Sequence, residues 1–255
     1  MMTANLNMVR TPPRTRELLD TEVTCLAMDF EARGFVELDV PSMYTFEGQW
    51  AKSPLKISPR AWRGGAWPYV RVVRVDGGDA VQVLNMVWFP SEHTAAPVFG
   101  CELLVFRRGV HLVVFDLFAT DSTHEPTPPR AILRELRGAW SAAAGELPEW
   151  GEEVFSEDAM ILKPGTRTSI DPSSVLPSRH GLSRALLECD ASSIGDKEAH
   201  SARLKTRARF IDVQGRNDPA APFLERIAGH TWTHAFVDDV LYPTWLLGSS
   251  LAPSW

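Results

Sequence analysis

The sequence predicts a single α/β sandwich built on an antiparallel sheet. Two observations predict it: a run of apolar strands separated by turn residues occupies the middle of the chain, and segments with helical spacing precede and follow that run. The balance of 44% hydrophobic and 23% charged residues is that of an ordinary globular protein, and 255 residues suffice for a sizeable core.

Three consecutive strands, 81–89, 98–106 and 110–118, form the centre of this prediction. Prolines at 90 and 97 flank the loop between the first two, and Arg-Arg-Gly at 107–109 separates the second from the third. The segment WPYVRVVRV at 67–75 is a further expected strand, joined to the next by an Asp-Gly-Gly-Asp turn. Together these segments predict a four-stranded antiparallel meander from about residue 67 to 118.

The rest of the chain is expected to be helical or irregular. Apolar spacing predicts helices at 15–33, 130–144, 181–189, 198–215, 220–229 and 231–242, with short extended segments at 35–41 and 159–162. Proline-rich stretches at 42–62, 119–129 and 164–178 are expected to be irregular. Residues 1–14 are expected to form a loose N-terminal arm, which leaves 15–255 as one domain.

Charge and cysteine content argue against several classes of protein. A net charge of −6 argues against general nucleic-acid binding and gives no reason to expect a membrane surface. No apolar run is long enough to span a bilayer, and the N-terminus has no apolar signal core. Cys25, Cys101 and Cys189 form neither a metal-binding spacing nor a disulfide framework, which favours the cytoplasm.

Two polar residues stand inside the apolar rows of the central strands. A symmetric hairpin between 81–89 and 98–106 places Asn85 directly opposite Glu102. A carboxyl buried in an apolar sheet tends to hold its proton, which suits a proton donor. The alternative, which the pattern alone favours, is a satisfied polar pair on a solvent-facing side of the sheet, with the large apolar residues turned to the core.

Other polar residues carry weaker signals. His230 and His234 have the i, i+4 spacing that places two metal ligands on one helix face, but the pattern shows no acidic or cysteine partner nearby, so a surface pair is expected. His111 is expected to be a partly buried structural histidine. Asp116 continues the face of Glu102 if the turn at 106–110 is symmetric, or else caps a strand end. Phosphate-loop, HExxH, CxxC and GxSxG motifs do not occur in the sequence.

The central stretch also resembles a known family. VQVLNMVWFP, PVFGCELL and VVFDLF follow the order and spacing of the strands of ferredoxin-dependent bilin reductases. LPEWGEEVFSEDAMILKP and ARFIDVQGRNDPAAPFLERIAG resemble later segments of that family. The resemblance covers roughly residues 67–240. It implies a three-layer α/β/α sandwich, in which a central antiparallel sheet is flanked by helices and a linear tetrapyrrole lies between the sheet and the late helices.

The resemblance also implies the chemistry. Members of the family carry no metal, no flavin and no other permanently bound cofactor; reduced ferredoxin supplies single electrons and the protein supplies protons to a bilin radical. The expected substrate is biliverdin IXα or a dihydrobiliverdin, and the expected product is of the phytochromobilin or phycoerythrobilin type. A monomer that uses ferredoxin, but neither nucleic acid nor a membrane, is expected.

Carried over by position, three residues are expected to be catalytic. Glu102 stands where the family usually has an aspartate, one methylene shorter, and is the expected central proton donor. Asp212, in FIDVQ, stands near a second catalytic aspartate of several members. Asn85 stands where phycocyanobilin-forming members have a histidine and phytochromobilin- and phycoerythrobilin-forming members have an asparagine, and it is expected to position the bilin or a water. Arg71 or Val73 occupies the place where phycocyanobilin-forming members have a glutamate.

Two other functions remain open. The change from aspartate to glutamate at position 102 is compatible with a bilin- or haem-binding protein that has lost turnover. The same sequence pattern is compatible with an unrelated α/β domain that carries a polar pair in its sheet.

Overall fold

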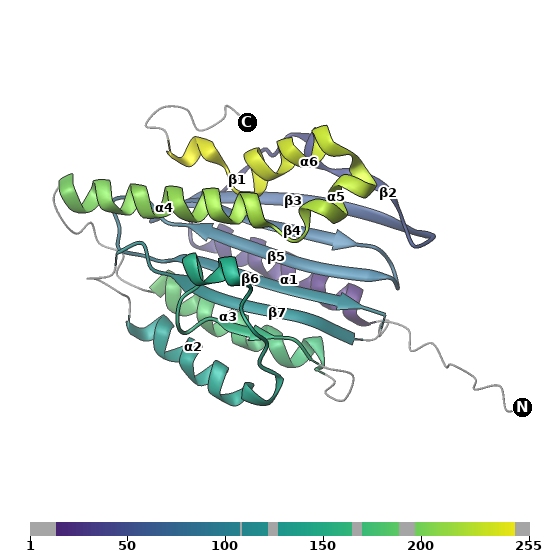
Figure 1. Ribbon diagram of the computed structural model, residues 1–255, viewed down its shortest axis with the longest axis horizontal. Helices are drawn as coiled ribbons and strands as arrows, with labels where there is room; N and C mark the ends of the chain where they lie inside the picture. The colour runs from purple at the N-terminus through teal and green to yellow at the C-terminus, as the bar shows by residue number, and fades with distance from the viewer. Residues whose placement is uncertain (1–13, 108, 122–126, 165–169, 189–196, 248–255) are drawn as a thin grey trace, which may run out of the picture.

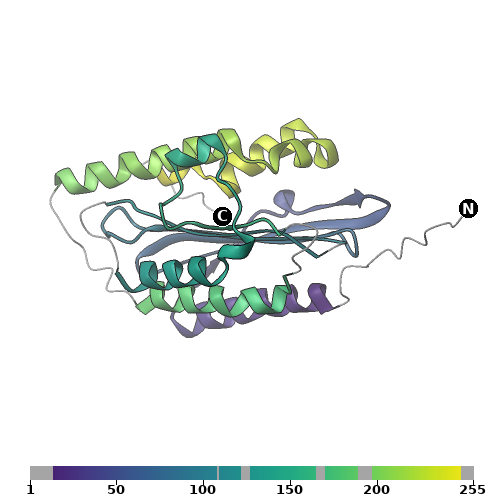
Figure 2. The same ribbon diagram turned by 60° about the horizontal axis from the view of Figure 1, so that its bottom comes forward.

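The computed structural model describes residues 14–107, 109–121, 127–164, 170–188 and 197–247. Across these residues a central sheet lies between two layers of helices (Figures 1 and 2). Helices α1 (Arg14–Ala32), α2 (Thr127–Ala139) and α3 (Pro172–Glu188) cover one face, and α4 (Lys197–Asn217), α5 (Ala221–Ala228) and α6 (His230–Phe236) cover the other. This arrangement confirms the expected α/β/α sandwich.

The strands described here form one antiparallel sheet in the order β1-β3-β4-β5-β6-β7-β8, with β2 paired to β3. Their bounds are β1 Val36–Leu38, β2 Phe46–Trp50, β3 Ser53–Gly64, β4 Trp67–Asp76, β5 Val81–Phe89, β6 Val98–Phe106, β7 Gly109–Phe118 and β8 Met160–Leu162. The predicted meander is therefore confirmed as β4 to β7. The turn before β5 also forms as expected, because Gly78 adopts a φ of 58° that favours glycine.

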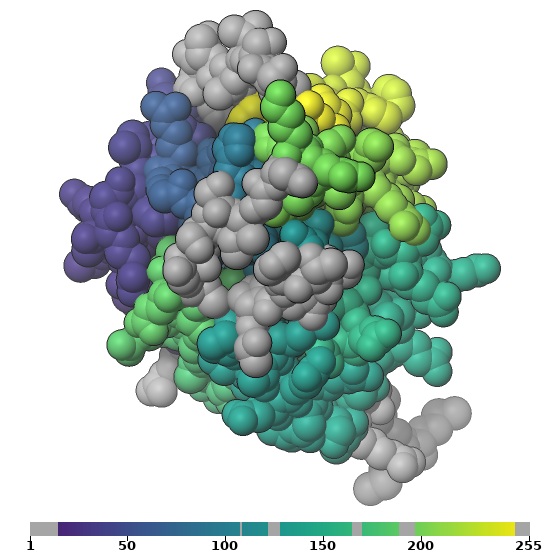
Figure 3. All heavy atoms as spheres, turned by 90° about the vertical axis from the view of Figure 1, so that its left-hand side faces the viewer, coloured from purple at the N-terminus to yellow at the C-terminus, as the bar shows by residue number. Residues whose placement is uncertain are grey.

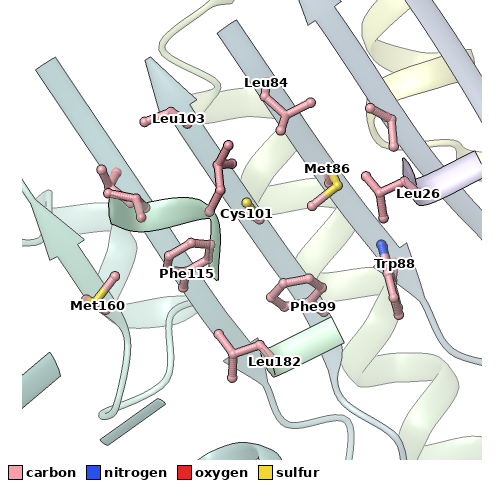
Figure 4. Packing of buried hydrophobic residues seen from close by; sticks show 14 of the residues in the cluster. Leu26, Leu84, Met86, Trp88, Phe99, Cys101, Leu103, Phe115, Met160 and Leu182 are labelled. Carbon is pink, nitrogen blue, oxygen red and sulfur yellow. The ribbon is translucent and has the colours of Figure 1, made fainter. Parts of the chain in front are cut away.

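Alternation along the strands separates two cores. On the α1–α3 face, Trp88 and Phe99 of neighbouring strands pack edge to face, 5.4 Å between ring centroids, above Leu26 of α1 and Leu182 of α3 (Figure 4). The helix α1 contributes one stripe, since Leu19, Leu26 and Phe30 are all buried. The predicted large apolar residues of β5 and β6 do face this core.

The other face of the sheet has its own core beneath α4–α6. It includes the buried rings of Tyr69 and Phe89 from the sheet and of Phe210 and Phe236 from the helices. Figure 3 looks onto one end of the molecule and shows α1, in purple, on the side opposite the yellow-green layer of α4–α6. Residues of one strand therefore contribute alternately to the two cores.

The prediction that 42–62 is irregular is wrong. Strands β2 and β3 form a hairpin there, and its turn uses positive φ at Ala51 and Lys52 in place of glycine. On its outer side, β3 pairs with β2 up to Ile57 and with β1 from Ala61. Pro59 lies between these two stretches, where the missing proline N–H costs no hydrogen bond to a neighbouring strand.

The predicted irregular stretch at 164–178 is also partly wrong, because α3 begins at Pro172. Asp171 caps this helix by accepting a hydrogen bond from the Ser173 backbone N–H at 2.9 Å, and a proline in the first turn loses no helical bond. After α6, a π-helical turn (Val237–Leu241) and a 3₁₀ turn (Thr244–Leu247) return the chain to the sheet. The expected arm at 1–13 lies outside the described residues, and α1 includes Arg14.

No helix in the described ranges combines the length and the apolar character needed to cross a membrane.

Candidate active site

A cavity of about 690 Å³ lies between the sheet and the α4–α6 layer. Its lining is mainly apolar and aromatic, with polar groups at a few points, as is usual for a site that binds an organic ligand. The polar side chains that reach it from the sheet include Asn85 of β5, Glu102 of β6 and Asp116 of β7, and Asp218 reaches it from the end of α4. The predicted polar pair thus faces a cavity, and not open solvent.

The register of β5 and β6 brings Asn85 and Glu102 together as predicted. The two residues are direct cross-strand partners, and Asn85 Nδ2 donates a long hydrogen bond of 3.4 Å to Glu102 Oε2. Burial, helped by the nearby Asp218, raises the pKa of Glu102 to about 7, although Asn85 and Arg71 act to lower it. A glutamic acid with this pKa is poised to donate a proton near neutral pH.

Asp218 is a second carboxyl at the cavity, and sequence reasoning missed it. It follows α4 directly, and its Oδ1 accepts a hydrogen bond from the Ala220 backbone N–H at 2.7 Å. This bond closes the turn that leads from α4 into α5. The Tyr242 hydroxyl also donates a hydrogen bond to Asp218, and burial raises the pKa of this carboxyl above its usual range.

Arg71 supplies a buried positive charge beside these carboxyls. It is fully buried, its Nε donates to the Leu241 carbonyl at 2.8 Å, and its Nη1 donates to Asn85 Oδ1 at 2.5 Å. The guanidinium also lies 5.6 Å from the ring centroid of Tyr242. Among the described residues, Nη2 has no hydrogen-bond partner. Burial lowers the pKa of Arg71, while Tyr242, Asp218 and Glu102 favour its charged form.

Arg71 fixes the orientation of the Asn85 amide. A guanidinium can only donate hydrogen bonds, so the Asn85 oxygen must face Arg71 and the Asn85 nitrogen must face Glu102. Of the two positions that the resemblance left open, Val73 is the cross-strand partner of Asn85, but Arg71 makes the side-chain contact. Sequence alone could not choose between them, because both residues lie on the same face of β4.

Asp212 lies elsewhere, which corrects its predicted position. Its side chain is exposed, forms an ion pair with Arg216 one turn later on α4, and is not part of the cavity lining. The resemblance placed Asp212 near the site. The buried face of α4 includes Arg203 and Arg207, and Asp212 lies outside that face.

The two buried arginines have backbone partners that explain their burial. Arg207 donates to the carbonyls of Pro90 and Leu246, both at 2.7 Å, and Arg203 donates to the carbonyl of Glu92 at 3.0 Å. They fasten α4 to the loop that follows β5. This contact holds the end of α4, and with it Asp218, over the sheet.

Asp116 lies on the face of Glu102, as the first of its two alternatives predicts. It pairs across the sheet with Gly100, on the face of Glu102, and it anchors the loop before β8, since its Oδ1 accepts hydrogen bonds from the Ser156 backbone N–H at 3.1 Å and hydroxyl at 2.6 Å. Burial raises the pKa of Asp116 to about 6, although the bonds from Ser156 lower it. Its hydrogen bonds favour an anchoring role.

His111 is exposed, so the prediction of a partly buried structural histidine is wrong. The register of β6 and β7 shifts between Leu104 and Val105, and His111 is the unpaired residue of this bulge. The bulge lets His111 and Leu112, which are sequence neighbours, both reach the cavity. The His111 ring lies edge-on to Phe106, 5.1 Å between centroids.

The comparisons with known proteins agree with this geometry. Phycoerythrobilin:ferredoxin oxidoreductase of Nostoc punctiforme is 27% identical over 183 residues, which cover 68% of this chain and 70% of that protein. Phycocyanobilin:ferredoxin oxidoreductase of Prochlorococcus marinus (strain MIT 9313) is 27% identical over 208 residues, covering 78% of this chain and 75% of that protein.

A solved structure shows the same fold. Tomato phytochromobilin synthase in complex with biliverdin superimposes with a TM-score of 0.67, covering 90% of this chain and 85% of that chain at 14% sequence identity. The sequence model of the family described as ferredoxin-dependent bilin reductase matches residues 31–243. Because this match takes in every strand of the sheet and each cavity carboxyl described above, the chain belongs to the ferredoxin-dependent bilin reductases.

Proposed function

We propose that this enzyme reduces biliverdin IXα or a dihydrobiliverdin in the cavity between the sheet and α4–α6, by single-electron steps through bilin radicals. Its family establishes ferredoxin-dependent reduction of a bilin. The observation that carries the proposal is the cluster of Asn85, Glu102 and Asp218, two carboxyls of raised pKa in a mainly apolar cavity. A large apolar substrate fits such walls, and proton transfer needs such acids.

Electrons and protons balance as follows. Each carbon–carbon double bond that becomes a single bond takes two electrons, from two reduced ferredoxins, and two protons. Glu102 gives the first proton to the bilin and becomes a carboxylate, with Arg71 nearby as its counter-charge. Asp218 then takes a proton from solvent, which keeps the group neutral beside Arg71, and gives the second proton. Solvent returns one proton to Glu102 before the next turnover.

The positive charge of Arg71 balances one negative charge on the carboxyl pair of Glu102 and Asp218. With Arg71 positive, one carboxylate and one carboxylic acid among Glu102 and Asp218 give a neutral group, and the mutual effect of the two acids disfavours ionising both. The site therefore keeps a transferable proton near neutral pH. The Asn85 nitrogen, turned away from Arg71, is free to donate to a carbonyl oxygen of the bilin.

Asn85 also supports a product of the phytochromobilin or phycoerythrobilin type. Phycocyanobilin-forming members, as noted above, have a histidine at this position and a glutamate on the preceding strand, where this chain has Asn85 and either Arg71 or Val73. An amide does not protonate a pyrrole as an imidazolium can. The proposed proton donors are therefore the two carboxyls alone.

The test is an anaerobic assay of biliverdin with a ferredoxin-reducing system, with products separated by chromatography. Reduced bilins that form only when ferredoxin is supplied support the proposal. A biliverdin spectrum that shifts on binding without any reduced product would instead identify a bilin-binding protein. An unchanged spectrum on mixing would exclude both functions.

A further inference from the structure

Glu225, His230 and His234 converge at the corner between α5 and α6. Glu225 Oε1 lies 3.1 Å from His230 Nδ1 and 3.6 Å from His234 Nε2. The three potential ligand atoms all lie within 4.8 Å of one another. The acidic partner that the sequence pattern did not show is therefore present, supplied by the preceding helix.

The local backbone explains why these side chains meet. Residues four apart in a helix share a face, which brings the rings of His230 and His234 to 4.1 Å between centroids. Gly229, with a φ of 85°, ends α5 and reverses the chain into α6, and its N–H bonds to the Glu225 carbonyl at 3.0 Å. A residue with a side chain would be strained at this φ.

The spacing of the ligand atoms fits a metal ion. Zinc bonds of about 2.0–2.2 Å in a tetrahedron place neighbouring ligand atoms roughly 3.4 Å apart. The separations from Glu225 Oε1 to the two imidazole nitrogens, 3.1 and 3.6 Å, lie on either side of that value. Side-chain exposures of 42% for Glu225, 75% for His230 and 58% for His234 leave the site open to an ion from solvent.

We propose that Glu225, His230 and His234 bind a divalent transition-metal ion, with Zn²⁺ as the best match to two imidazoles and one carboxylate. Three protein ligands leave the fourth position to water. The ion links α5 to α6, and both helices line the substrate cavity, α5 through Phe223 and α6 through Phe236. Its proposed role is to stiffen this wall, and it takes no part in the proton transfers assigned to Glu102 and Asp218.

The test uses the full-length chain without an affinity tag, titrated with Zn²⁺ or Co²⁺ alone. We expect one ion per chain by calorimetry, absorption bands of tetrahedral Co²⁺, and a rise in melting temperature that a chelator reverses. Loss of a residue that only supports a metal ligand typically weakens metal affinity about 10–100-fold. His234→Asn and Glu225→Gln each remove a ligand, so each should weaken Zn²⁺ binding by more than that. Both substitutions replace exposed side chains, so the variants should fold.

The matched control is His93→Asn, which removes an exposed histidine whose Nε2 lies 3.8 Å from Glu92 Oε1, outside this cluster. It should bind Zn²⁺ like the unmodified protein. Absence of stoichiometric binding, or binding that survives in His234→Asn or in Glu225→Gln, would overturn the proposal. These readouts need no bilin and no ferredoxin, so they stand apart from the outcome of the activity assay.

Discussion

Arg71 Nη1 donates a hydrogen bond to Oδ1 of Asn85 across the β4–β5 pair, and this bond turns the Asn85 nitrogen toward Glu102. The buried Arg71 guanidinium thus determines the orientation of the Asn85 amide. The amide in turn contacts Glu102, whose pKa is about 7. The three residues act as a unit, so the effects of substituting them should not be additive.

Arg71→Met should move the alkaline limb of the turnover profile to higher pH. The Arg71 charge lowers the pKa of Glu102, so its removal raises that pKa and keeps the acid protonated further into the alkaline range. Arg71→Lys retains the charge and should leave the limb near its original position. Single-turnover rates measured across pH will separate the variants, and coincident profiles for all three proteins would contradict this role.

Glu102→Gln should bind biliverdin normally but stall its reduction. The amide matches the carboxyl in size and cannot release a proton, so an electron should be added without protonation and a radical should accumulate. The loss of rate expected for a missing general acid is about 10²–10⁴-fold. Electron paramagnetic resonance will detect the radical. Glu102→Asp is the control that restores an acid, and full turnover by Glu102→Gln would exclude the role.

Asp218→Asn and Asp212→Asn form a matched pair near the end of α4. Asp218 lies at the cavity with a raised pKa, whereas Asp212 is exposed and paired with Arg216. Asp218→Asn should therefore slow reduction by about 10²-fold or more, or leave a partly reduced bilin, and Asp212→Asn should change little. Product chromatography will tell them apart. Equal losses in both variants would restore Asp212 as a candidate.

Stability should depend on pH through Glu102. Its pKa is about 7 in the folded protein against 4.5 ordinarily, so between these values the folded state binds a proton that the unfolded state releases. The free energy of unfolding should therefore fall as pH rises through this window. Urea titrations at several pH values should show a shallower fall for Glu102→Gln.

Asp116 gives this experiment an internal reference. Its raised pKa of about 6 contributes a fall of the same sign between about pH 4 and 6, and that part should persist in Glu102→Gln. Because Asp116 contributes equally to both proteins, their slopes of unfolding free energy against pH should differ only between about pH 4.5 and 7. Identical pH dependence in both proteins would show that Glu102 titrates normally.

Periodicity predicted the meander and the pairing of Asn85 with Glu102 because both depend on local rules. The side chains of a strand alternate, and a symmetric hairpin leaves one register. Each of the two interpretations of this pair is correct in part. The large apolar neighbours pack in a core on one side of the sheet, and the polar pair faces a cavity on the other side.

The rest could not be predicted because it depends on tertiary partners. Arg71, Arg203 and Arg207 are buried only because distant carbonyls accept their hydrogen bonds. Counting charged residues as exposed therefore gave no sign that Arg71 contacts Asn85, or that Asp218 and not Asp212 lies at the cavity. The hairpin of β2 and β3 was hidden in the same way by prolines that only the finished sheet accommodates.

The alternation of β5 and β6 between a packed core and the cavity limits how this sequence can change. Adding or deleting one residue within a strand moves the side chains beyond that point to the other face, so Glu102 of β6 or Asn85 of β5 would turn into the apolar core. Substitutions at positions 85 and 102 leave the alternation intact. Single substitutions can therefore change the polar groups at the cavity, whereas insertions and deletions are tolerated only in the loops between strands.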